Sequence, residues 1–389
     1  MKKVNTKRKY KHFIILVLVF VLLISGIFLN LDRIELRIKG YDRQDTNLIL
    51  NLDQEKIDAI LDYDSIIKFS KWDQIKNNQN YVYYDRYRKI NKESTKEIVS
   101  YVDAYIKLKD ALDDLGYSSK ILFKNSDLYS IANLRLLVNQ KISYQKAKNY
   151  LKIHGVQIAD LSKYVKSEQD PLKAILSISY SMIDSSKSSD RVYEIQNPNQ
   201  LVLIKKGFVV RSDYVPSNLR KVDIPYETEK GQMQDEAAKA LEDMYADAKT
   251  KGYELVVKSS YRSYEEQLAI YNEYFSIYDA DYAASLVSTP GSSEHQLGLS
   301  VDLTSQDVVD GTYSTFGETK AYKWVEKNAY KYGYILRYPE NRSSQTGATN
   351  EPWHFRYVGK KAAKEIYKNN WTLEDYILAH GFTYEMTIQ

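Results

Sequence analysis

Residues 293–302 have the sequence SEHQLGLSVD, and residues 351–357 have the sequence EPWHFRY. Together they contain the imidazoles of His295 and His354 and the carboxylate of Asp302. This donor set suits a Zn²⁺ ion, which in catalytic sites takes three protein ligands and keeps one position open. A further carboxylate, Glu351, stands three residues before the second histidine and is suited to act as a general base. The pattern predicts a zinc site with a catalytic base, in a chain that has only five histidines among 389 residues.

The residues around these candidates predict how the backbone presents them. His295 and Asp302 are too far apart for one helical turn, and their spacing has the wrong parity for one straight strand. Gly298, between them, supplies a bend that turns both side chains inward. The aspartate then falls in a predicted strand over residues 299–303, and the second histidine begins another over residues 353–358. Two predicted strands therefore carry the donors, so the site is expected on a sheet.

Beyond about residue 196 the pattern alternates between short strands and helices, which is typical of an α+β domain built around a small antiparallel sheet. Ser263 and Glu266 form a predicted capping box, which places the start of one helix. A hairpin is predicted over residues 201–210, with its turn at residues 205–207. The further strands are predicted at 254–258 and 334–337, and the helices at 232–250, 264–278, 319–332 and 359–369.

Residues 32–190 read as a mostly helical, polar region with no identifiable chemistry. Helical periodicity is clearest over residues 52–61 and 97–108. Tyrosine is abundant, with 36 residues in the chain, and it serves either half-buried helix faces or, less simply, a surface for sugar rings. The serine-rich stretch 181–191 is the most linker-like segment, so the domain boundary is predicted there. The zinc domain is predicted to span residues 196–389.

Charge and hydropathy predict a membrane-anchored protein. The formal net charge is 55 − 51 = +4, and six cations before residue 13 leave a body of 4 − 6 = −2, which argues against nucleic-acid binding. An uncharged apolar run over residues 13–29 is long enough for a transmembrane helix. We therefore predict a cytoplasmic basic segment (1–12), a membrane anchor (13–31) and an extracytoplasmic remainder. A cleaved signal peptide or a buried helix are the alternatives, and the absence of cysteine fits a bacterial cell surface.

Four stretches, in this order along the chain, resemble the VanY-type D-alanyl-D-alanine carboxypeptidases, whose zinc site is similar to that of lysostaphin and the hedgehog N-terminal domain. The resemblance covers about residues 196–385, roughly half of the chain. The stretches are YRSYEEQ at 261–267, SEHQLGLSVD at 293–302, YILRYP at 334–339 and EPWHFRYVG at 351–359.

This resemblance implies a role for each matching residue. His295, Asp302 and His354 are expected to be the zinc ligands and Glu351 the catalytic base. Arg262 is expected to bind the terminal carboxylate of the substrate, since its planar guanidinium can bond both oxygens. Gln267 and Ser293 are its expected neighbours in the pocket, and Arg337 and Arg356 are expected to support the site or line the pocket.

The expected activity is removal of C-terminal D-alanine from peptidoglycan stem peptides at the bacterial cell surface. An L,D-carboxypeptidase or an endopeptidase acting on the same polymer is an alternative within the enzymes. A non-catalytic wall-binding module that kept the metal site is an alternative of another class, although such a module needs no base at Glu351. Residues 32–190 are a spacer, a wall-binding element or a partner site, and the oligomeric state stays open.

Overall fold

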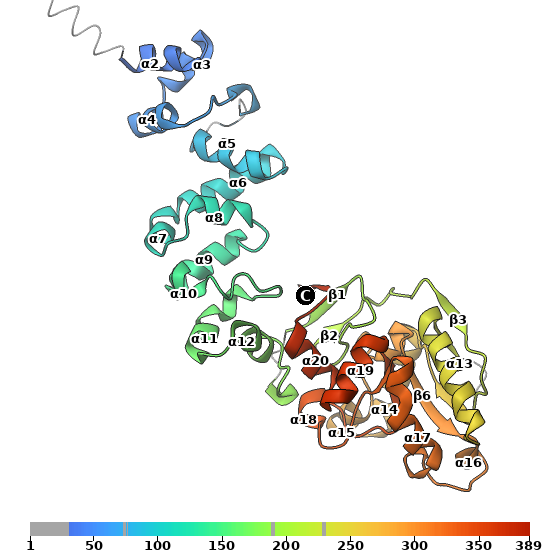
Figure 1. The fold of residues 1–389 in the computed structure, drawn as a ribbon. Coiled ribbons are helices and arrows are strands. Elements are labelled where there is room, and N and C mark those ends of the chain that lie inside the picture. The colour runs from blue at the N-terminus through green and yellow to red at the C-terminus, as the bar shows by residue number, and fades with distance from the viewer. Residues whose placement is uncertain (1–30, 73–74, 76, 188–190, 228–230) are drawn as a thin grey trace, which may run out of the picture. The chain divides into compact units, whose positions relative to one another are not determined.

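The structure, a computed structural model, describes residues 31–72, 75, 77–187, 191–227 and 231–389. The predicted basic segment and the predicted anchor over residues 13–31 lie outside this range, apart from Leu31. Among the described residues, no helix has both the length and the apolar character needed to cross a membrane. The chain divides into two compact units, Met1–Gln145 and Lys146–Gln389, whose elements are labelled in Figure 1.

The described part of the first unit consists of short helices joined by tight turns. Ser94 begins one of them with a capping box, in which its hydroxyl accepts from the Glu97 backbone and the Glu97 carboxylate accepts from the Ser94 backbone. The two clearest predicted helices are present as α4 and α6. The bounds are α2 Leu31–Lys39, α3 Arg43–Ile49, α4 Gln54–Asp62, α5 Tyr81–Ile90, α6 Thr95–Ile106, α7 Lys109–Asp114, α8 Ser119–Lys124, α9 Ile131–Gln140 and α10 Tyr144–Ala147, the last crossing into the second unit.

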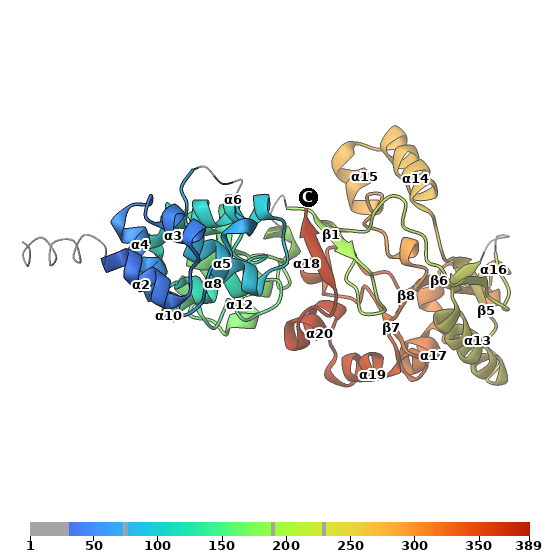
Figure 2. The same ribbon diagram turned by 90° about the horizontal axis from the view of Figure 1, so that it is seen from above.

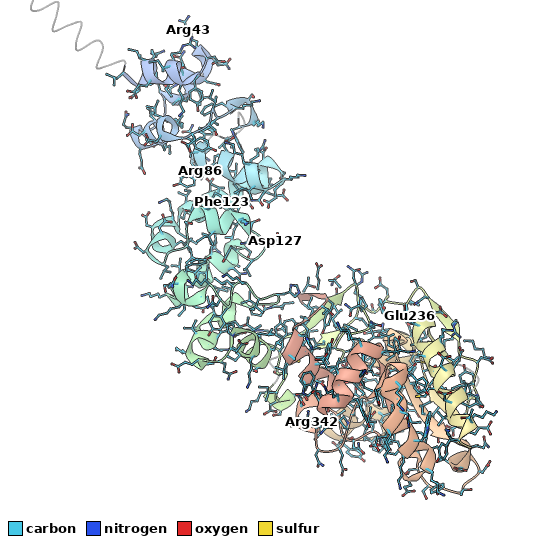
Figure 3. All side chains as sticks on the ribbon, viewed as in Figure 1. Arg43, Arg86, Phe123, Asp127, Glu236 and Arg342 are labelled. Carbon is cyan, nitrogen blue, oxygen red and sulfur yellow. The ribbon has the colours of Figure 1, made fainter. Side chains whose placement is uncertain are left out.

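Aromatic rings fill the core of this unit and explain the abundance of tyrosine. Phe123, labelled in Figure 3, lies with its ring centroid 5.1 Å from Tyr87, 6.1 Å from Tyr101 and 5.2 Å from Tyr105. All three pairs are edge-to-face, an arrangement that adds to the free energy of burying the rings. The Tyr101 hydroxyl donates to the Tyr129 carbonyl (2.9 Å), so its polar end is satisfied inside the core. These tyrosines therefore serve buried helix faces, as the simpler interpretation predicted.

The second unit is built around a four-stranded antiparallel sheet in the order β5–β6–β8–β7. Asp302 pairs with His354 across β6 and β8, so these two side chains emerge on the same face of the sheet. All four strands occur where they were predicted, within one or two residues at each end. Their bounds are β5 Leu255–Ser259, β6 Ser300–Ser305, β7 Tyr334–Leu336 and β8 His354–Tyr357.

Helices cover the other face of this sheet. Helices α13 (Asp235–Thr250), α17 (Lys320–Asn328) and α19 (Lys360–Asn369) pack together there, as Figure 2 shows. The buried Tyr334 points to this side, because its hydroxyl donates to the Ala237 carbonyl of α13 (2.7 Å). The α+β arrangement predicted for this region is confirmed, with helices on one face and the His354 side chain on the other.

Smaller elements complete the unit. The hairpin predicted over residues 201–210 is confirmed only at its turn, which an isolated antiparallel bridge between Lys205 and Phe208 closes. The predicted first strand is wrong, since residues 201–204 form no strand, and β2 pairs in parallel with β1. Strand β9 pairs antiparallel with β1, and β3 with β4. The remaining bounds are β1 Tyr193–Gln196, β2 Phe208–Val209, β3 Leu219–Lys221, β4 Gln232–Gln234, β9 Glu385–Ile388, α11 Leu161–Ser167, α12 Pro171–Ile178, α14 Tyr264–Ile277, α15 Ala280–Leu286, α16 Gln306–Val309, α18 Ser343–Thr346 and α20 Leu373–His380.

The second compact unit begins about 50 residues before the predicted zinc domain. The reason lies in contacts between residues 146–190 and the C-terminal end of the chain. The Tyr180 ring packs edge-on against Phe382 at 4.8 Å, and Nε2 of His154 donates to the Tyr384 carbonyl at 3.2 Å. The serine-rich stretch thus lies inside a compact unit, and the start of the enzyme domain at residue 196 remains a prediction.

Candidate active site

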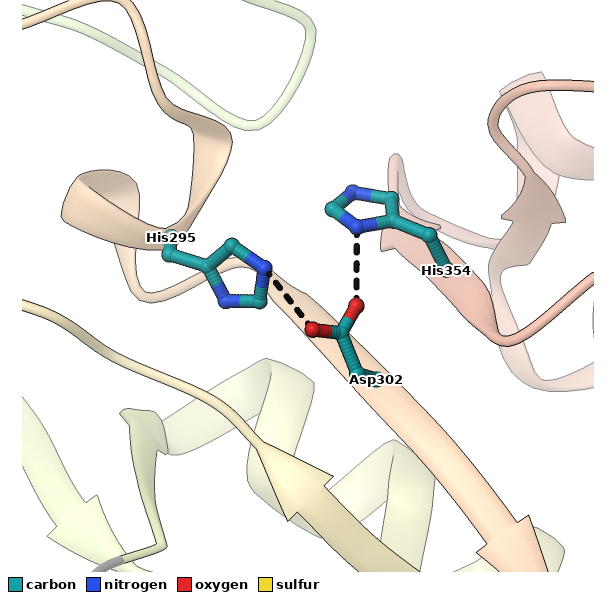
Figure 4. A group of neighbouring side chains, drawn as sticks. All are labelled: His295, Asp302 and His354. Atoms are coloured by element: carbon teal, nitrogen blue, oxygen red, sulfur yellow. Dashed lines mark hydrogen bonds and ion pairs between the residues drawn. The ribbon is translucent and has the colours of Figure 1, made fainter. Parts of the chain in front are cut away.

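Three donor groups meet on the face of the sheet opposite helices α13, α17 and α19. His295, Asp302 and His354 each offer one ligand atom, and these atoms lie within 4.8 Å of one another. Nε2 of His295 lies 3.3 Å from one oxygen of Asp302, and Nδ1 of His354 lies 2.9 Å from the other. Figure 4 shows both imidazoles turned toward this carboxylate from opposite sides. The two stretches that decided the sequence analysis therefore converge in space.

A turn at Gly298 brings the first histidine to the strand that carries the aspartate. His295 lies in a short 3-10 helix, η4 (Glu294–Leu297), which Gly298 ends in the left-handed conformation with φ of 63°. A Cβ atom at this glycine would lie 2.7 Å from Cδ2 of Leu219. Glycine alone adopts this positive φ without strain and adds no Cβ atom against Leu219. The predicted bend is therefore present, and it requires glycine at this position.

A β-bulge in β5 lies next to the backbone carbonyl that binds the same histidine. The pairing of β5 with β6 shifts by one residue between Val257 and Ser259, which then lies opposite Asp302. The next carbonyl, of Ser260, accepts a hydrogen bond from Nδ1 of His295 at 2.6 Å. This bond leaves Nε2 as the histidine nitrogen that faces the cluster.

Glu351 lies beside the second histidine. One of its carboxylate oxygens is 3.8 Å from Nδ1 of His354, and its side chain is 26% exposed. Its backbone is fixed at both ends, since its N–H donates to the Tyr338 carbonyl and its carbonyl accepts from the His354 N–H, both at 3.1 Å. A carboxylate that borders the cluster and still reaches solvent has the placement a general base needs.

The three predicted substrate-binding residues differ in their distance from the cluster. The Arg262 backbone donates to the His295 carbonyl (3.3 Å), and its buried Nε has no hydrogen-bond partner in the described part of the chain. Gln267 is buried in α14 and donates to the Ser288 carbonyl at 2.8 Å. Ser293 is buried ahead of η4, where its carbonyl accepts from Gln296 at 3.1 Å. The Arg262 backbone thus contacts a residue of the cluster directly, and the substrate-binding roles of Arg262, Gln267 and Ser293 stay predictions.

The sequence analysis missed a buried ionic network behind His354. Glu294, with no exposed side-chain surface, accepts from Nε of Arg337 (2.8 Å) and from Nη1 of Arg356 (2.9 Å). Arg337 also makes two hydrogen bonds with Glu374, at 2.8 and 3.0 Å. Arg337 and Arg356 were expected to support the site, but nothing in the sequence named the two glutamates as their partners.

Electrostatics inside the cluster favour a cation. Burial lowers the pKa of His354, but its hydrogen bonds with the carboxylates of Asp302 and Glu294 outweigh this and raise the pKa to about 9. Burial raises the pKa of Asp302, yet the adjacent His295 and His354 hold it below its usual range. His354 therefore retains its proton beside the Asp302 carboxylate, and a metal ion competes with that proton for the place.

Burial and nearby charged groups also shift the pKa values of Glu351 and Arg262. Burial raises the pKa of Glu351, and the nearby Asp302 and Glu294 carboxylates add to this effect against His354. Burial lowers the pKa of Arg262, while the carboxylates of Asp302 and Glu351 act in the opposite direction. The guanidinium therefore lies within electrostatic reach of both the cluster and the base.

A cleft of about 660 Å³ opens beside Glu351. Tyr338, whose ring lies 5.0 Å from that of His354, lines it together with the base. Its other walls come from residues 286–292 and 343–348 and from residues 179–186, which precede β1. The cleft is large enough for a short peptide, and the Glu351 carboxylate borders it.

Two imidazoles and a carboxylate fit Zn²⁺, and a neighbouring glutamate open to a cleft completes the arrangement. The fold and the site together define a metal-dependent hydrolase of the metallopeptidase class. Comparison with known proteins gives the family: residues 230–360 match the model of the VanY family, described as D-alanyl-D-alanine carboxypeptidase. The chain belongs to this family of metallo-carboxypeptidases, as its resemblance predicted.

Two relatives and one solved structure illustrate the similarity. "Putative carboxypeptidase YodJ" of Bacillus subtilis (strain 168) is 44% identical over 195 residues, 49% of this chain and 71% of the relative. The bifunctional D-Ala-D-Ala dipeptidase and D-Ala-D-Ala carboxypeptidase VanXYC of Enterococcus gallinarum is 35% identical over 181 residues, 46% of this chain and 93% of the relative. A variant of the vancomycin resistance D,D-pentapeptidase VanY, crystallised in complex with Zn(II), is 34% identical over 46% of this chain and 98% of its own, with a TM-score of 0.39.

Proposed function

We propose that this protein is a zinc-dependent carboxypeptidase that removes the C-terminal D-alanine from peptidoglycan stem peptides. The observation that carries the proposal is the convergence of His295, Asp302 and His354 beside the carboxylate of Glu351. The three donors would hold the metal, and the cleft beside Glu351 would hold the peptide. Membership of the D-alanyl-D-alanine carboxypeptidase family supports the choice of substrate.

Each residue has a separate task in this reaction. Zn²⁺, when bound, supplies a Lewis acid that polarises the scissile carbonyl and acidifies water. Glu351 accepts the proton of the attacking water and later donates it to the leaving amine, a task that a partly buried carboxylate with a raised pKa performs well. Arg262 binds the free terminal carboxylate, which restricts cleavage to the end of a peptide.

We also propose that the reaction takes place outside the cytoplasmic membrane. The support is the apolar run over residues 13–29 and the cations before it, which predict an anchor with its N-terminal side in the cytoplasm. The substrate polymer lies on the same side of the membrane as the enzyme domain in this arrangement. Labelling of intact bacteria with a reagent that cannot cross the membrane tests it, and protection of the enzyme domain would contradict it.

The activity is tested on synthetic stem peptides with mass spectrometry of the products. We expect loss of one D-alanine from a pentapeptide, and loss of this activity when a chelator removes the metal. Cleavage of a tetrapeptide but not of a pentapeptide would instead assign an L,D-carboxypeptidase. Activity that survives complete metal removal would rule out the zinc mechanism.

Exchange of the base separates catalysis from metal binding. Glu351→Gln is expected to lower kcat by about 10²- to 10⁴-fold, the range for general acid–base catalysis, while the chain still binds one equivalent of zinc. Glu340→Gln is the matched control, because it removes an exposed carboxylate from the same connection between β7 and β8. Wild-type turnover by the Glu351 variant would favour the non-catalytic wall-binding module.

A further inference from the structure

Glu294 is a buried carboxylate that the proposed reaction does not use. It directly precedes His295 in η4, and its side chain is fully buried. Its Oε1 accepts both guanidinium bonds, from Arg337 at 2.8 Å and from Arg356 at 2.9 Å. Its Oε2 faces Nε2 of His354 at 3.4 Å. One carboxylate oxygen thus accepts from the two arginines, and the other faces the imidazole of His354.

The two nitrogens of His354 have different surroundings. Nδ1 faces the cluster, 2.9 Å from Asp302 and 3.8 Å from Glu351. Nε2 points away from the cluster toward Glu294. Both nitrogens face carboxylates, which only accept, so both can donate while no metal is bound. A metal bound through Nδ1 would take the place of the proton that faces Asp302 and would leave the Nε2 proton for Glu294. The same division holds at His295, whose Nδ1 donates to a carbonyl and whose Nε2 faces the cluster.

The charges around Glu294 suit a permanent anion. Three buried cations, Lys205, Arg337 and Arg356, face two buried carboxylates, Glu294 and Glu374. A buried carboxylate is costly unless it is paired and hydrogen-bonded, and here two guanidinium groups meet that need. Glu294 therefore stays an acceptor toward the imidazole, whatever occupies the cluster.

We propose that Glu294 is a positioning residue for the metal site. Its carboxylate accepts the Nε2–H of His354 and so fixes the tautomer and the orientation of the ring, with Nδ1 directed at the metal. Such a carboxylate partner also makes the imidazole a stronger ligand. The inference rests on the proposed function only in that Zn²⁺ occupies the cluster of His295, Asp302 and His354.

Zinc affinity of the full chain tests this role, measured with Zn²⁺ alone in competition with a chromophoric chelator. Glu294→Gln is expected to bind zinc about 10- to 100-fold more weakly, as loss of a carboxylate partner of a histidine ligand typically does. Glu374→Gln is the matched control, because it removes a buried partner of the same Arg337 without touching His354. Its zinc affinity is expected within about threefold of wild type. Equal weakening by both variants, or none by Glu294→Gln, would overturn the proposal.

A measurement on the unaltered chain covers the case in which the Glu294 variant fails to fold. Long-range ¹H–¹⁵N correlation of the zinc-loaded chain reports which ring nitrogen of each of the five histidines carries a proton. We expect His354 with its proton on Nε2, and a proton on Nδ1 would refute the proposal. Neither measurement uses peptide cleavage. A wild-type chain that cleaved no stem peptide would refute the proposed function, but it would not change the result expected from either measurement.

Discussion

At the scale of single residues, the site depends on a few polar groups held without freedom to move. The side chains of His295 and His354 are 3% and 6% exposed, whereas Asp302 is 15% and Glu351 26% exposed. The imidazoles are thus fixed by the protein, and the carboxylates form the edge that water and substrate reach. This gradient fits a site in which the ligands are rigid and the base meets the substrate.

Arg262 offers a test of terminal-carboxylate recognition. Arg262→Lys keeps the positive charge but loses the planar fork that bonds two oxygens. We expect kcat/KM to fall about 10- to 100-fold, mainly through a higher KM, corresponding to about 1.4–2.7 kcal/mol. Steady-state kinetics on a stem peptide with a free C-terminus measures the change.

The control compares the same peptide with its C-terminus amidated. Wild type should strongly prefer the free acid, and the Arg262→Lys variant should lose most of that preference. Arg211→Lys, at an exposed arginine paired with Asp213, should leave the preference unchanged. A variant at Arg262 that retained full discrimination would show that another group reads the carboxylate.

The sequence was most informative at this scale. The convergence of His295, Asp302 and His354, with Glu351 beside them, was predictable because few histidines occur and these two lie in segments with a recognisable pattern. Glu294 and Glu374 were not predictable, because a charged residue in a sequence gives no sign of burial. Their meaning arises only when strands distant in sequence bring Arg337 between them.

At the scale of elements, short turns set the geometry of the cluster. The bend at Gly298 is held from β4, where the Gln234 backbone donates to the Gly298 carbonyl (2.8 Å) and the Gln234 side chain to the Leu297 carbonyl (2.7 Å). Strands and capped helices were predictable from local periodicity and from the capping box at Ser263, which the structure contains. The hairpin predicted over residues 201–210 forms only its turn, closed by the bridge between Lys205 and Phe208, because β2 takes its strand partner from β1.

Gly298→Ala tests the bend. Positive φ costs an alanine about 1–2 kcal/mol, and the added Cβ also meets Leu219 at 2.7 Å. We expect a loss of about 2–3 kcal/mol in the free energy of unfolding, measured with urea, together with weaker zinc binding. Gly311→Ala is the control, since its φ of 75° is also positive but nothing lies within 4 Å of its Cβ position. If both variants lost the same stability and bound zinc like wild type, the bend would not set the site.

At the scale of the whole molecule, a buried ion pair joins residues well before the four-stranded sheet to the segment that leads into β1. Asp160, with a side chain 2% exposed, pairs with both terminal nitrogens of Arg191, which precedes β1. It also accepts from Lys163 (2.9 Å) and Ser179 (2.8 Å). The sequence placed a linker here because serine-rich composition reports local flexibility, whereas long-range ion pairs have no local signature.

This ion pair predicts how stability changes with pH. Burial raises the pKa of Asp160, but the hydrogen bonds from Arg191, Lys163 and Ser179 outweigh it and leave the pKa below its usual range. The unfolded carboxyl has a pKa of about 3.9, so above that pH both states are ionised and the pair contributes fully. As the pH falls below about 4, the unfolded chain takes up the proton first, and the contribution is lost as the pH passes the lower folded pKa.

We therefore expect Asp160→Asn to be less stable than wild type at pH 6, with a gap in unfolding free energy that narrows as the pH falls below about 4. Urea unfolding of the zinc-free full chain between pH 3 and pH 7 measures this gap. Asp310→Asn is the control variant. It removes an exposed carboxylate and so shows how far the loss of one negative charge by itself changes the unfolding free energy. A gap that stayed constant over this range would mean that Asp160 stabilises the unit by packing alone, and that its charge does not tie its own segment to the one that leads into β1.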